Sequence, residues 1–256
     1  MKEKLETDIY FTPREAAKHL NLSLSAIKNY IYANKLKTLK TPGGHHRISK
    51  DELLVTMGKE GDLSIKTEGL SALMETYCMA LVNVFKLLGL PGNSFIIHSK
   101  RVSEISYKLS KALGLTDKDI LYAKMAGLVH DIGHMAIDRR ILLKSESLTA
   151  QEYELVKVHP SRGEELLNSI KELKEIADIV SQHHERIDGA GYPRGLKEKD
   201  IKKAARIISI AEAYDSMVSE YSYKKPVSKD IAISELVEEK GLQFDGEIVE
   251  QLIEII

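Results

Sequence analysis

Six of the chain's nine histidines lie between residues 98 and 184, and five of them form a pattern with two aspartates. An imidazole and a carboxylate that directly follow the apolar run 126–129 are costly to bury unless a cation pairs with them. No thiolate accompanies the histidines, so nothing suggests a closed structural zinc site. We therefore predict a metal-dependent hydrolase whose metal ligands are His98, His130, Asp131, His159, His183, His184 and Asp215.

The number of donors indicates how many metal ions this site would hold. Five imidazoles and two carboxylates exceed the ligands of one four-coordinate zinc, which favours two divalent ions. Nitrogen and oxygen donors with open positions suit iron or manganese, and zinc is a further option. Asp131 can bridge two such ions, about 3.5 to 4 Å apart, together with a nucleophilic hydroxide. The chemistry that these residues predict is in-line hydrolysis of a phosphodiester.

Charge divides the chain into a basic head and an acidic remainder. The first fifty residues hold ten Lys/Arg and four Asp/Glu, and the remaining residues hold 27 and 34. The excess favours a polyanionic partner, although exposed lysines on an ordinary domain also produce one. Cys78 is the only cysteine, no N-terminal signal peptide is evident, and Glu75 and Lys86 interrupt the most apolar window. We expect a cytoplasmic protein without a membrane anchor.

The basic head contains the helix-capping and turn residues expected of a small helical module. A capping box at residues 12–15 predicts a helix to about Leu20, and Ser23 can cap a second helix. Pro-Gly-Gly at residues 42–44 indicates a hairpin turn between cationic arms, and residues 49–52 form a second capping box. The apolar face of the second helix would contain Ile27, Tyr30 and Ile31.

Residues 8–57 resemble the winged helix-turn-helix domain of the MerR and excisionase families, in which a Gly-Gly-His-Arg-type wing follows the second helix. That resemblance implies binding to double-stranded DNA as a homodimer. Tyr30 could instead belong to the core, and His45 and His46 could simply be solvated. The residues expected to contact DNA are Ser25, Lys28 and Tyr30 in the major groove, and Lys40, His46 and Arg47 on phosphate.

A long helix is predicted between the two regions. After a polar, glycine-containing segment at 58–61, apolar residues recur at three- and four-residue steps over residues 66–88. The stripe would pack against the hydrolase domain or pair with the same helix of a second chain; we favour packing, with a dimer contact in addition. Its members are Leu70, Leu73, Met74, Tyr77, Leu81, Phe85 and Leu88.

Residues 93–254 are similar to the HD-GYP branch of the HD superfamily. The similarity rests on HDIG at 130–133, the Ile-Leu-x-Lys element at 141–144, His159-Pro160 and HHERIDGAGYPRGL at 183–196. It implies an all-helical domain that hydrolyses cyclic di-GMP to linear pGpG, to GMP, or to both. The residues that it places on the nucleotide are His134, Arg186, Tyr192 and Lys224.

Three departures from the family pattern affect these expectations. His134 stands where a lysine is common and would hold phosphate less firmly, since it is only partly charged near neutral pH. Ser94 stands where trinuclear members have a glutamate, so two metals are expected. Residues 221–224 keep a cation at Lys224 but lack the arginine fork that binds phosphate through two bonds.

The sequence as a whole predicts a mainly α protein with a small winged helix-turn-helix domain and an all-helical HD-GYP domain. The expected divisions are 1–57 for the DNA-binding domain, 58–90 for the linker and long helix, and 91–256 for the phosphohydrolase. The alternative is a transcription factor whose catalytically weak domain senses cyclic di-GMP or another nucleotide. A third hypothesis keeps the enzyme but changes its substrate to another cyclic dinucleotide or a guanosine polyphosphate.

Overall fold

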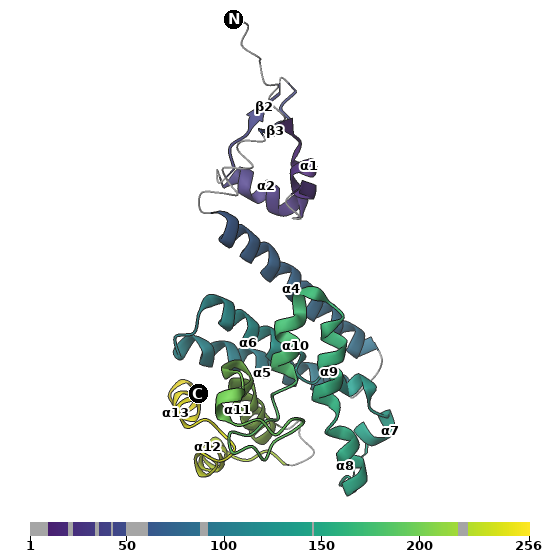
Figure 1. Cartoon of the computed structure of the whole chain (residues 1–256), viewed down its shortest axis with the longest axis vertical. Helices are drawn as coiled ribbons and strands as arrows, with labels where there is room; N and C mark the ends of the chain where they lie inside the picture. Colours follow the sequence, from purple (N-terminus) through teal and green to yellow (C-terminus); the bar gives the residue numbers. More distant parts are fainter. Residues whose placement is uncertain are drawn as a thin grey trace, which may run out of the picture. The chain divides into compact units, whose positions relative to one another are not determined.

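The computed structural model describes residues 10–19, 23–33, 36–41, 43–49, 61–87, 92–144, 146–219 and 225–256 (Figure 1). The chain divides into two compact units, Met1–Leu73 and Met74–Ile256. The division falls inside one long helix, within the predicted connecting segment 58–90. Helices dominate the described residues, which confirms the expected mainly α class.

The N-terminal unit is a two-helix module with a small antiparallel sheet. Thr12 and Glu15 cap its first helix reciprocally, because the Thr12 amide donates to the Glu15 carboxylate at 2.8 Å and the Glu15 amide donates to Thr12 Oγ1 at 3.2 Å. Ile27, Ile31 and Ile48 are buried in its core. The elements are β1 (Tyr10–Phe11), α1 (Pro13–His19), α2 (Leu24–Tyr32), β2 (Leu39–Lys40) and β3 (His46–Ser49), with sheet order β1-β3-β2.

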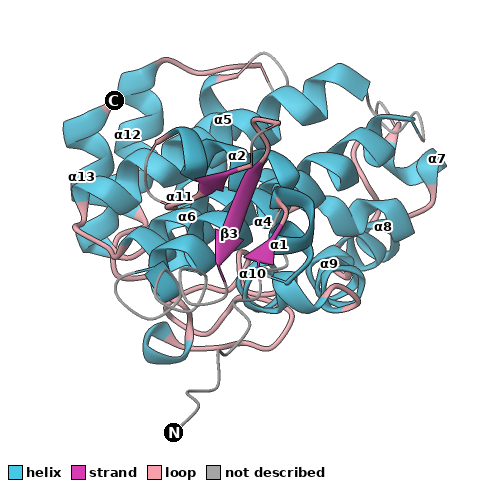
Figure 2. Ribbon diagram, turned by 90° about the horizontal axis from the view of Figure 1, so that it is seen from above, coloured by secondary structure: helices cyan, strands magenta, loops and turns pink. Residues whose placement is uncertain are grey.

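This unit confirms the predicted pair of helices followed by a hairpin. Figure 2 shows its strands in magenta, and they are the only strands among the described residues. The two-residue strand β1 was not predicted, because so short a segment has no periodic pattern and is held by backbone pairing to β3. The capping box at residues 49–52 and the helix expected after it lie outside the described residues.

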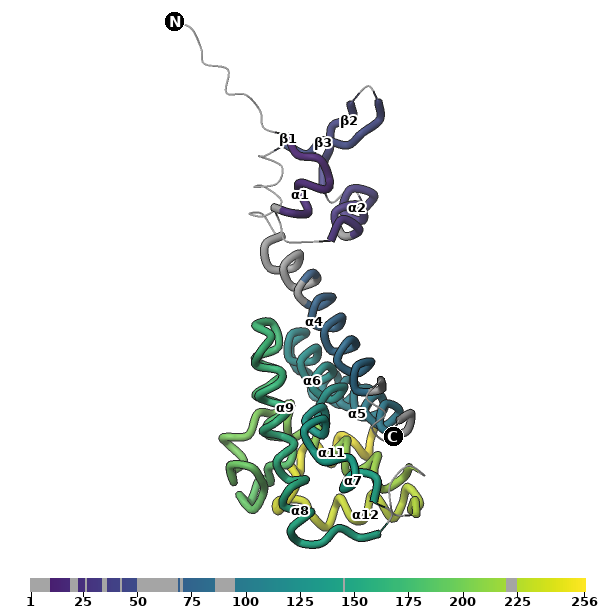
Figure 3. The backbone as a smooth tube through the Cα atoms, turned by 90° about the vertical axis from the view of Figure 1, so that its right-hand side faces the viewer, coloured from purple at the N-terminus to yellow at the C-terminus, as the bar shows by residue number. Residues whose placement is uncertain are grey.

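Helix α4 (Gly61–Leu87) is the predicted long helix, and it begins five residues earlier than expected. From Met74 onward it belongs to the C-terminal unit and runs beside its helices (Figure 3). Cys78, Val82 and Phe85 are buried there, and the Phe85 ring stacks on Phe95 with 4.3 Å between the ring centroids. The prediction that the stripe packs against the helical domain that follows it is therefore confirmed for this part of the stripe. None of the described helices has the length and apolar character needed to cross a membrane.

All the named elements in the described part of the C-terminal unit are helices, and an isolated β-bridge joins Lys240 and Phe244. Two apolar clusters form its core, one centred on the helices after α4 and one that joins the last helices of the chain. Its elements are α5 (Gly92–Ala112), α6 (Asp117–Val129), η1 (Ile132–Ala136), α7 (Arg139–Leu142), α8 (Ala150–Val156), α9 (His159–Asn168), η2 (Lys171–Leu173), α10 (Lys174–Val180), η3 (Glu198–Asp200), α11 (Lys203–Val218), α12 (Lys229–Glu238) and α13 (Gly246–Ile255).

Two close backbone contacts in this unit bring the histidine-bearing elements together. A Cβ atom on Gly127 of α6 would lie 3.1 Å from the Cα atom of Ser103 on α5, so the glycine lets these two helices approach. A Cβ atom on Gly133 of η1 would lie 1.9 Å from the carbonyl oxygen of His159, where α9 begins. The absence of a side chain at each position therefore decides how near His98, His130 and His159 come to one another.

Candidate metal centre

Three of the predicted ligands follow the C-terminal ends of helices, and this position orients their imidazole rings. The Nδ1 atoms of His130, His159 and His183 lie 2.9, 2.8 and 2.5 Å from the carbonyl oxygens of Gly127, Val156 and Val180. These carbonyls belong to the last turns of α6, α8 and α10, which lack amide partners from a continuing helix. Because a carbonyl oxygen only accepts, each Nδ1 must donate its proton, and each Nε2 points away from the helix end.

All three Nε2 atoms converge on the carboxylate of Asp131. They lie 3.1 Å (His130, to Oδ2), 3.2 Å (His159, to Oδ1) and 3.9 Å (His183, to Oδ1) from its oxygens. Asp131 thereby belongs to two groups of donor atoms whose members lie within 4.8 Å of one another. One group consists of His98, His130 and Asp131, and the other of Asp131, His159, His183 and His184.

The second group places two nitrogen lone pairs face to face. The Nε2 atoms of His159 and His183 are 3.1 Å apart, and both rings have committed their Nδ1 protons to carbonyls. Burial lowers the pKa of His159 and holds those of His183 and His184 well below the ordinary value, so these rings are neutral near pH 7. Neutral rings in this orientation present lone pairs to the same point, which is the arrangement that a divalent cation requires.

The first group has a different charge state in the absence of a cation. Burial acts to lower the pKa of His130, but the adjacent Asp131 carboxylate outweighs it and raises that pKa to about 9. Burial would likewise raise the pKa of Asp131, yet His130 and His134 hold it well below its usual range. An imidazolium thus occupies the place of a cation beside Asp131. His130 Nε2 is buried and has no well-aligned hydrogen bond among the described residues, so the donors fit a metal ion that displaces the proton.

Asp215 lies beside this centre but belongs to neither donor group. Its Oδ2 atom accepts from His98 Nδ1 at 2.7 Å and from Arg101 Nη2 at 3.0 Å, and its Oδ1 atom accepts from Arg101 Nε at 2.5 Å. His98 and Arg101 are neighbours one turn apart on α5. The carboxylate that was expected on metal therefore holds His98 by its Nδ1 atom and leaves Nε2 directed at the His130 side of the centre.

The loop that carries the GYP motif closes over His184. The Tyr192 ring stacks on the His184 ring at 4.8 Å between centroids, and the Tyr192 amide donates to the His184 carbonyl at 3.1 Å. The buried Glu185 carboxylate accepts from the amides of Arg194 and Leu196 at 2.7 and 2.9 Å, so it shapes the loop.

The remaining residues expected to contact the nucleotide do not all lie in the metal centre. His134 lies in the centre, with Nε2 3.3 Å from Asp131 Oδ1 and its ring stacked on His159 at 4.2 Å. Arg186 donates to Gln243 at 2.6 Å and to Asp188 at 2.8 Å, which anchors the loop to the C-terminal region. Lys224 lies outside the described residues.

Glu212 is a residue of this centre that the motifs did not reveal. It lies on α11, one turn before Asp215, and its Oε1 atom is 3.7 Å from His184 Nε2. Burial raises its pKa to about 8. The three-residue spacing from Asp215, which puts both side chains on one face of a helix, was the available signal.

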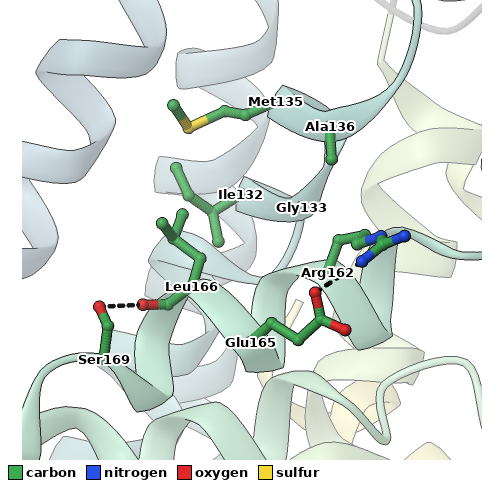
Figure 4. A pocket seen from close by; sticks show the side chains of 8 residues that line it. All are labelled: Ile132, Gly133, Met135, Ala136, Arg162, Glu165, Leu166 and Ser169. Carbon is green, nitrogen blue, oxygen red and sulfur yellow. Dashed lines mark hydrogen bonds and ion pairs between the residues drawn. The ribbon is translucent and has the colours of Figure 1, made fainter.

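A separate surface pocket of about 550 Å³ lies between η1 and α9 (Figure 4). None of the clustered imidazoles lines it. Its one pair of opposite charges is satisfied internally, because Arg162 donates to Glu165 at 2.7 Å. The remaining lining is mostly apolar, from Ile132, Met135 and Leu166. The histidine cluster rather than this pocket is therefore the candidate functional site.

The N-terminal unit presents some of its predicted DNA-contacting residues at the surface. Ser25, Lys28 and Lys40 are exposed, and His46 and Arg47 are partly exposed on β3. His46 Nδ1 lies 2.6 Å from Thr38 Oγ1, and Arg47 Nη1 donates to the His46 carbonyl at 3.1 Å. The structure corrects the prediction that Tyr30 contacts DNA. The Tyr30 side chain is 9% exposed and packs in the apolar core of the unit, because its position on α2 faces α1 and the sheet.

The fold and the site together define an all-helical domain with a His/Asp centre suited to divalent metal ions, preceded by a small helix-turn-helix unit. Residues 85–248 match the family model described as HD domain, and the chain belongs to this family. Residues 10–55 match the family model described as Helix-turn-helix domain. The resemblance to HD domains and the presence of a helix-turn-helix region are both confirmed.

Known proteins similar to this chain share its C-terminal region. A cyclic di-GMP phosphodiesterase of Thermotoga maritima is 36% identical over 160 residues, which cover 62% of this chain and 44% of that protein. A 3'3'-cGAMP-specific phosphodiesterase of Vibrio cholerae is 36% identical over 61% of this chain and 30% of its own length. A solved structure of an HDG"Y"P protein from Bdellovibrio bacteriovorus is 29% identical with a TM-score of 0.53, covering 62% of this chain and 51% of that one. The chain spans less than half the length of these curated relatives.

Proposed function

We propose that the C-terminal unit is a metal-dependent phosphodiesterase that hydrolyses cyclic di-GMP to linear pGpG, to GMP, or to both. The observation that carries this proposal is the convergence of the Nε2 atoms of His130, His159 and His183 on Asp131. The similar proteins support the substrate class, because their names specify cyclic di-GMP or 3'3'-cGAMP.

The two donor groups would hold two divalent ions, with iron or manganese as the first choice and zinc as an option. Asp131 would bridge the ions, since it is shared by both groups. When bound, such a pair activates a water molecule and neutralises charge on the scissile phosphate. Asp215 would serve this arrangement by orienting His98, whose Nδ1 atom it already holds at 2.7 Å.

The chain's own residues would bind and orient the nucleotide around this centre. Tyr192 stacks on His184, so the ring is held rigidly at the edge of the centre. The Lys157 ammonium group lies 5.4 Å from the ring centroid and pairs with Glu154 at 3.0 Å, so it could turn from that carboxylate to a dinucleotide phosphate. His134 Nε2 would donate to a phosphate oxygen in place of its present contact with Asp131 at 3.3 Å, and Lys224 would add a second cation.

The N-terminal unit would bind double-stranded DNA, and the protein would act as a cytoplasmic homodimeric regulator of the MerR type. The exposed cations Lys28 and Lys40 support this role, together with Ser25 on α2 and with His46 and Arg47 on β3. In this proposal the DNA-binding domain comprises residues 1–57, the linker and helix 58–90, and the phosphohydrolase 91–256. Nucleotide binding or hydrolysis would change operator affinity; equal affinity with and without nucleotide would contradict that coupling.

The experiment that tests the enzyme is turnover of cyclic di-GMP by protein reconstituted anaerobically with iron or manganese. Asp131→Ala is the matched loss-of-function variant, and 3'3'-cGAMP and a guanosine polyphosphate are the competing substrates. Hydrolysis by the wild type at about two metals per chain, lost in the variant, is expected. Faster hydrolysis of another nucleotide in this panel would reassign the substrate.

A nucleotide sensor is the second candidate, and His134 favours it. This residue stands where the family commonly has lysine, and its Nε2 atom already contacts Asp131 at 3.3 Å. Its imidazole therefore carries less charge for a phosphate and has an existing partner. Tight cyclic di-GMP binding to metal-loaded protein without any turnover would establish the sensor in place of the enzyme.

A further inference from the structure

Helix α8 carries a half-exposed aromatic side chain together with a lysine. Tyr153 is 50% exposed and is one of the large apolar side chains at the surface of the C-terminal unit. Lys157 follows it by four residues at the end of α8, a spacing that puts both side chains on one face of the helix. The Lys157 ammonium group lies 5.9 Å from the centroid of the Tyr153 ring. The two side chains therefore form one local surface.

The same ammonium group connects Tyr153 with the loop over the metal centre. It lies 5.4 Å from the centroid of the Tyr192 ring, and Tyr192 in turn stacks on His184. The pKa of Tyr192 is raised chiefly by burial, and the neighbouring Tyr153 hydroxyl adds to this effect. Tyr153 therefore lies at the outer side of Tyr192, and a continuous row of rings leads from the centre to the surface.

A half-exposed phenol ring beside a cation is a suitable surface for a nucleobase. Stacking on an aromatic side chain uses the π-face that every base has, and it removes apolar area of both rings from water. In a cyclic dinucleotide each base projects from the ring of sugars and phosphates, so a phosphate bound at the metal centre leaves the bases at its rim. Tyr153 lies at that rim, on the side of Tyr192 and His184.

We propose that the Tyr153 ring stacks on one nucleobase of a cyclic dinucleotide whose phosphate binds at the metal centre. The inference rests on the proposed function and adds to it a base-binding residue supplied by α8. Tyr153 contributes to affinity without choosing between guanine and adenine, because stacking requires only a π-face. At this position the site therefore accepts cyclic di-GMP and 3'3'-cGAMP alike.

Fluorescence of 2-aminopurine reports this contact, because stacking of that base on an aromatic ring quenches its emission. The probe is cyclic di-GMP with one guanine replaced by 2-aminopurine. It is mixed in a stopped-flow instrument with full-length protein loaded with Mn²⁺, so that binding is read before turnover. Tyr153→Ala removes the ring, and Tyr153→Phe keeps it. Tyr107→Ala is the matched control, because this tyrosine of α5 is also bordered by lysines, Lys111 at 5.4 Å and Lys124 at 5.8 Å from its ring centroid.

The expected result is a loss of probe affinity of about tenfold to a hundredfold in Tyr153→Ala, with a brighter bound probe than in the wild type. Tyr153→Phe and Tyr107→Ala should bind and quench the probe as the wild type does. In competition measurements Tyr153→Ala should lose affinity for cyclic di-GMP and for 3'3'-cGAMP by the same factor.

The outcomes separate this inference from the proposed function. Wild-type affinity and quenching in Tyr153→Ala, or an equal loss in Tyr153→Phe, would overturn the base contact and leave the phosphodiesterase intact. A wild-type protein that binds and quenches the probe but hydrolyses neither nucleotide would overturn the enzyme and support the base contact. A wild-type protein that binds neither nucleotide would overturn both.

Discussion

Gly133→Ala tests whether the backbone contact between η1 and α9 positions the candidate centre. The added Cβ atom would lie 1.9 Å from the carbonyl oxygen of His159 and 2.6 Å from the amide nitrogen of Gly163. Ordinary contacts between such atoms are about 3.5 Å, so α9 would have to move by roughly 1.5 Å. Both atoms belong to backbone, and neither can swing aside as a side-chain tip could.

The consequence should be visible in both stability and metal binding. Overpacking at a contact of this kind costs about 1–3 kcal/mol, and we expect the upper part of that range because the backbone resists displacement. His159 begins α9, so its Nε2 atom would move with the helix relative to Asp131, now 3.2 Å away. A shift of this size is large compared with a metal–nitrogen bond of about 2.0–2.1 Å. Affinity for the ion on the His159 side should fall at least tenfold.

Gly246→Ala is the control, since its added Cβ atom would lie 3.4 Å from the flexible end of Lys240. Urea unfolding of metal-free protein, followed by circular dichroism, gives the stability change, and Mn²⁺ titration gives the affinity. We expect a lower unfolding free energy and weaker binding in Gly133→Ala only. If Gly133→Ala matched the control in both measurements, the reasoning that this contact holds α9 in place would be refuted.

Three further predictions concern individual contacts of the centre. The pKa of His130 beside Asp131 is about 9, so its proton must leave before a metal ion binds. The affinity for Mn²⁺ should therefore rise about tenfold per pH unit from pH 6.5 to 8.5. A flat affinity profile in isothermal titration over this range would contradict the prediction. Arg101→Ala removes the partner of the buried Asp215 carboxylate, and urea unfolding should show a loss of about 1.5–3 kcal/mol. Glu185→Ala leaves two loop amides without their acceptor and should cost about 1–3 kcal/mol for each in the same assay, whereas an unchanged unfolding midpoint would exclude that role.

The sequence predicted those parts of the fold that are marked by apolar periodicity or by helix-capping residues. The capping box at Thr12 and Glu15 and the apolar stripe of α4 are local patterns, and the structure contains both. Strand β1 and the burial of Tyr30 depend on which segments meet in three dimensions. Spacing within α2 placed Tyr30 on an apolar face, but only the packing of that face against α1 and the sheet decides that the ring is unavailable to DNA.

The same distinction applies to the centre. Residue types and order identified the histidines of the centre, but they did not show that Asp215 is held by His98 and Arg101 or that Glu212 lies beside His184, because side-chain partners are set by how the helices pack. The orientation of the imidazoles, in contrast, has a local cause. A histidine one to three residues beyond a helix end meets an unpaired carbonyl, gives it the Nδ1 proton and directs Nε2 outward. Three helices that end near one carboxylate therefore build a set of nitrogen donors from local geometry alone, and only their meeting point requires the whole fold.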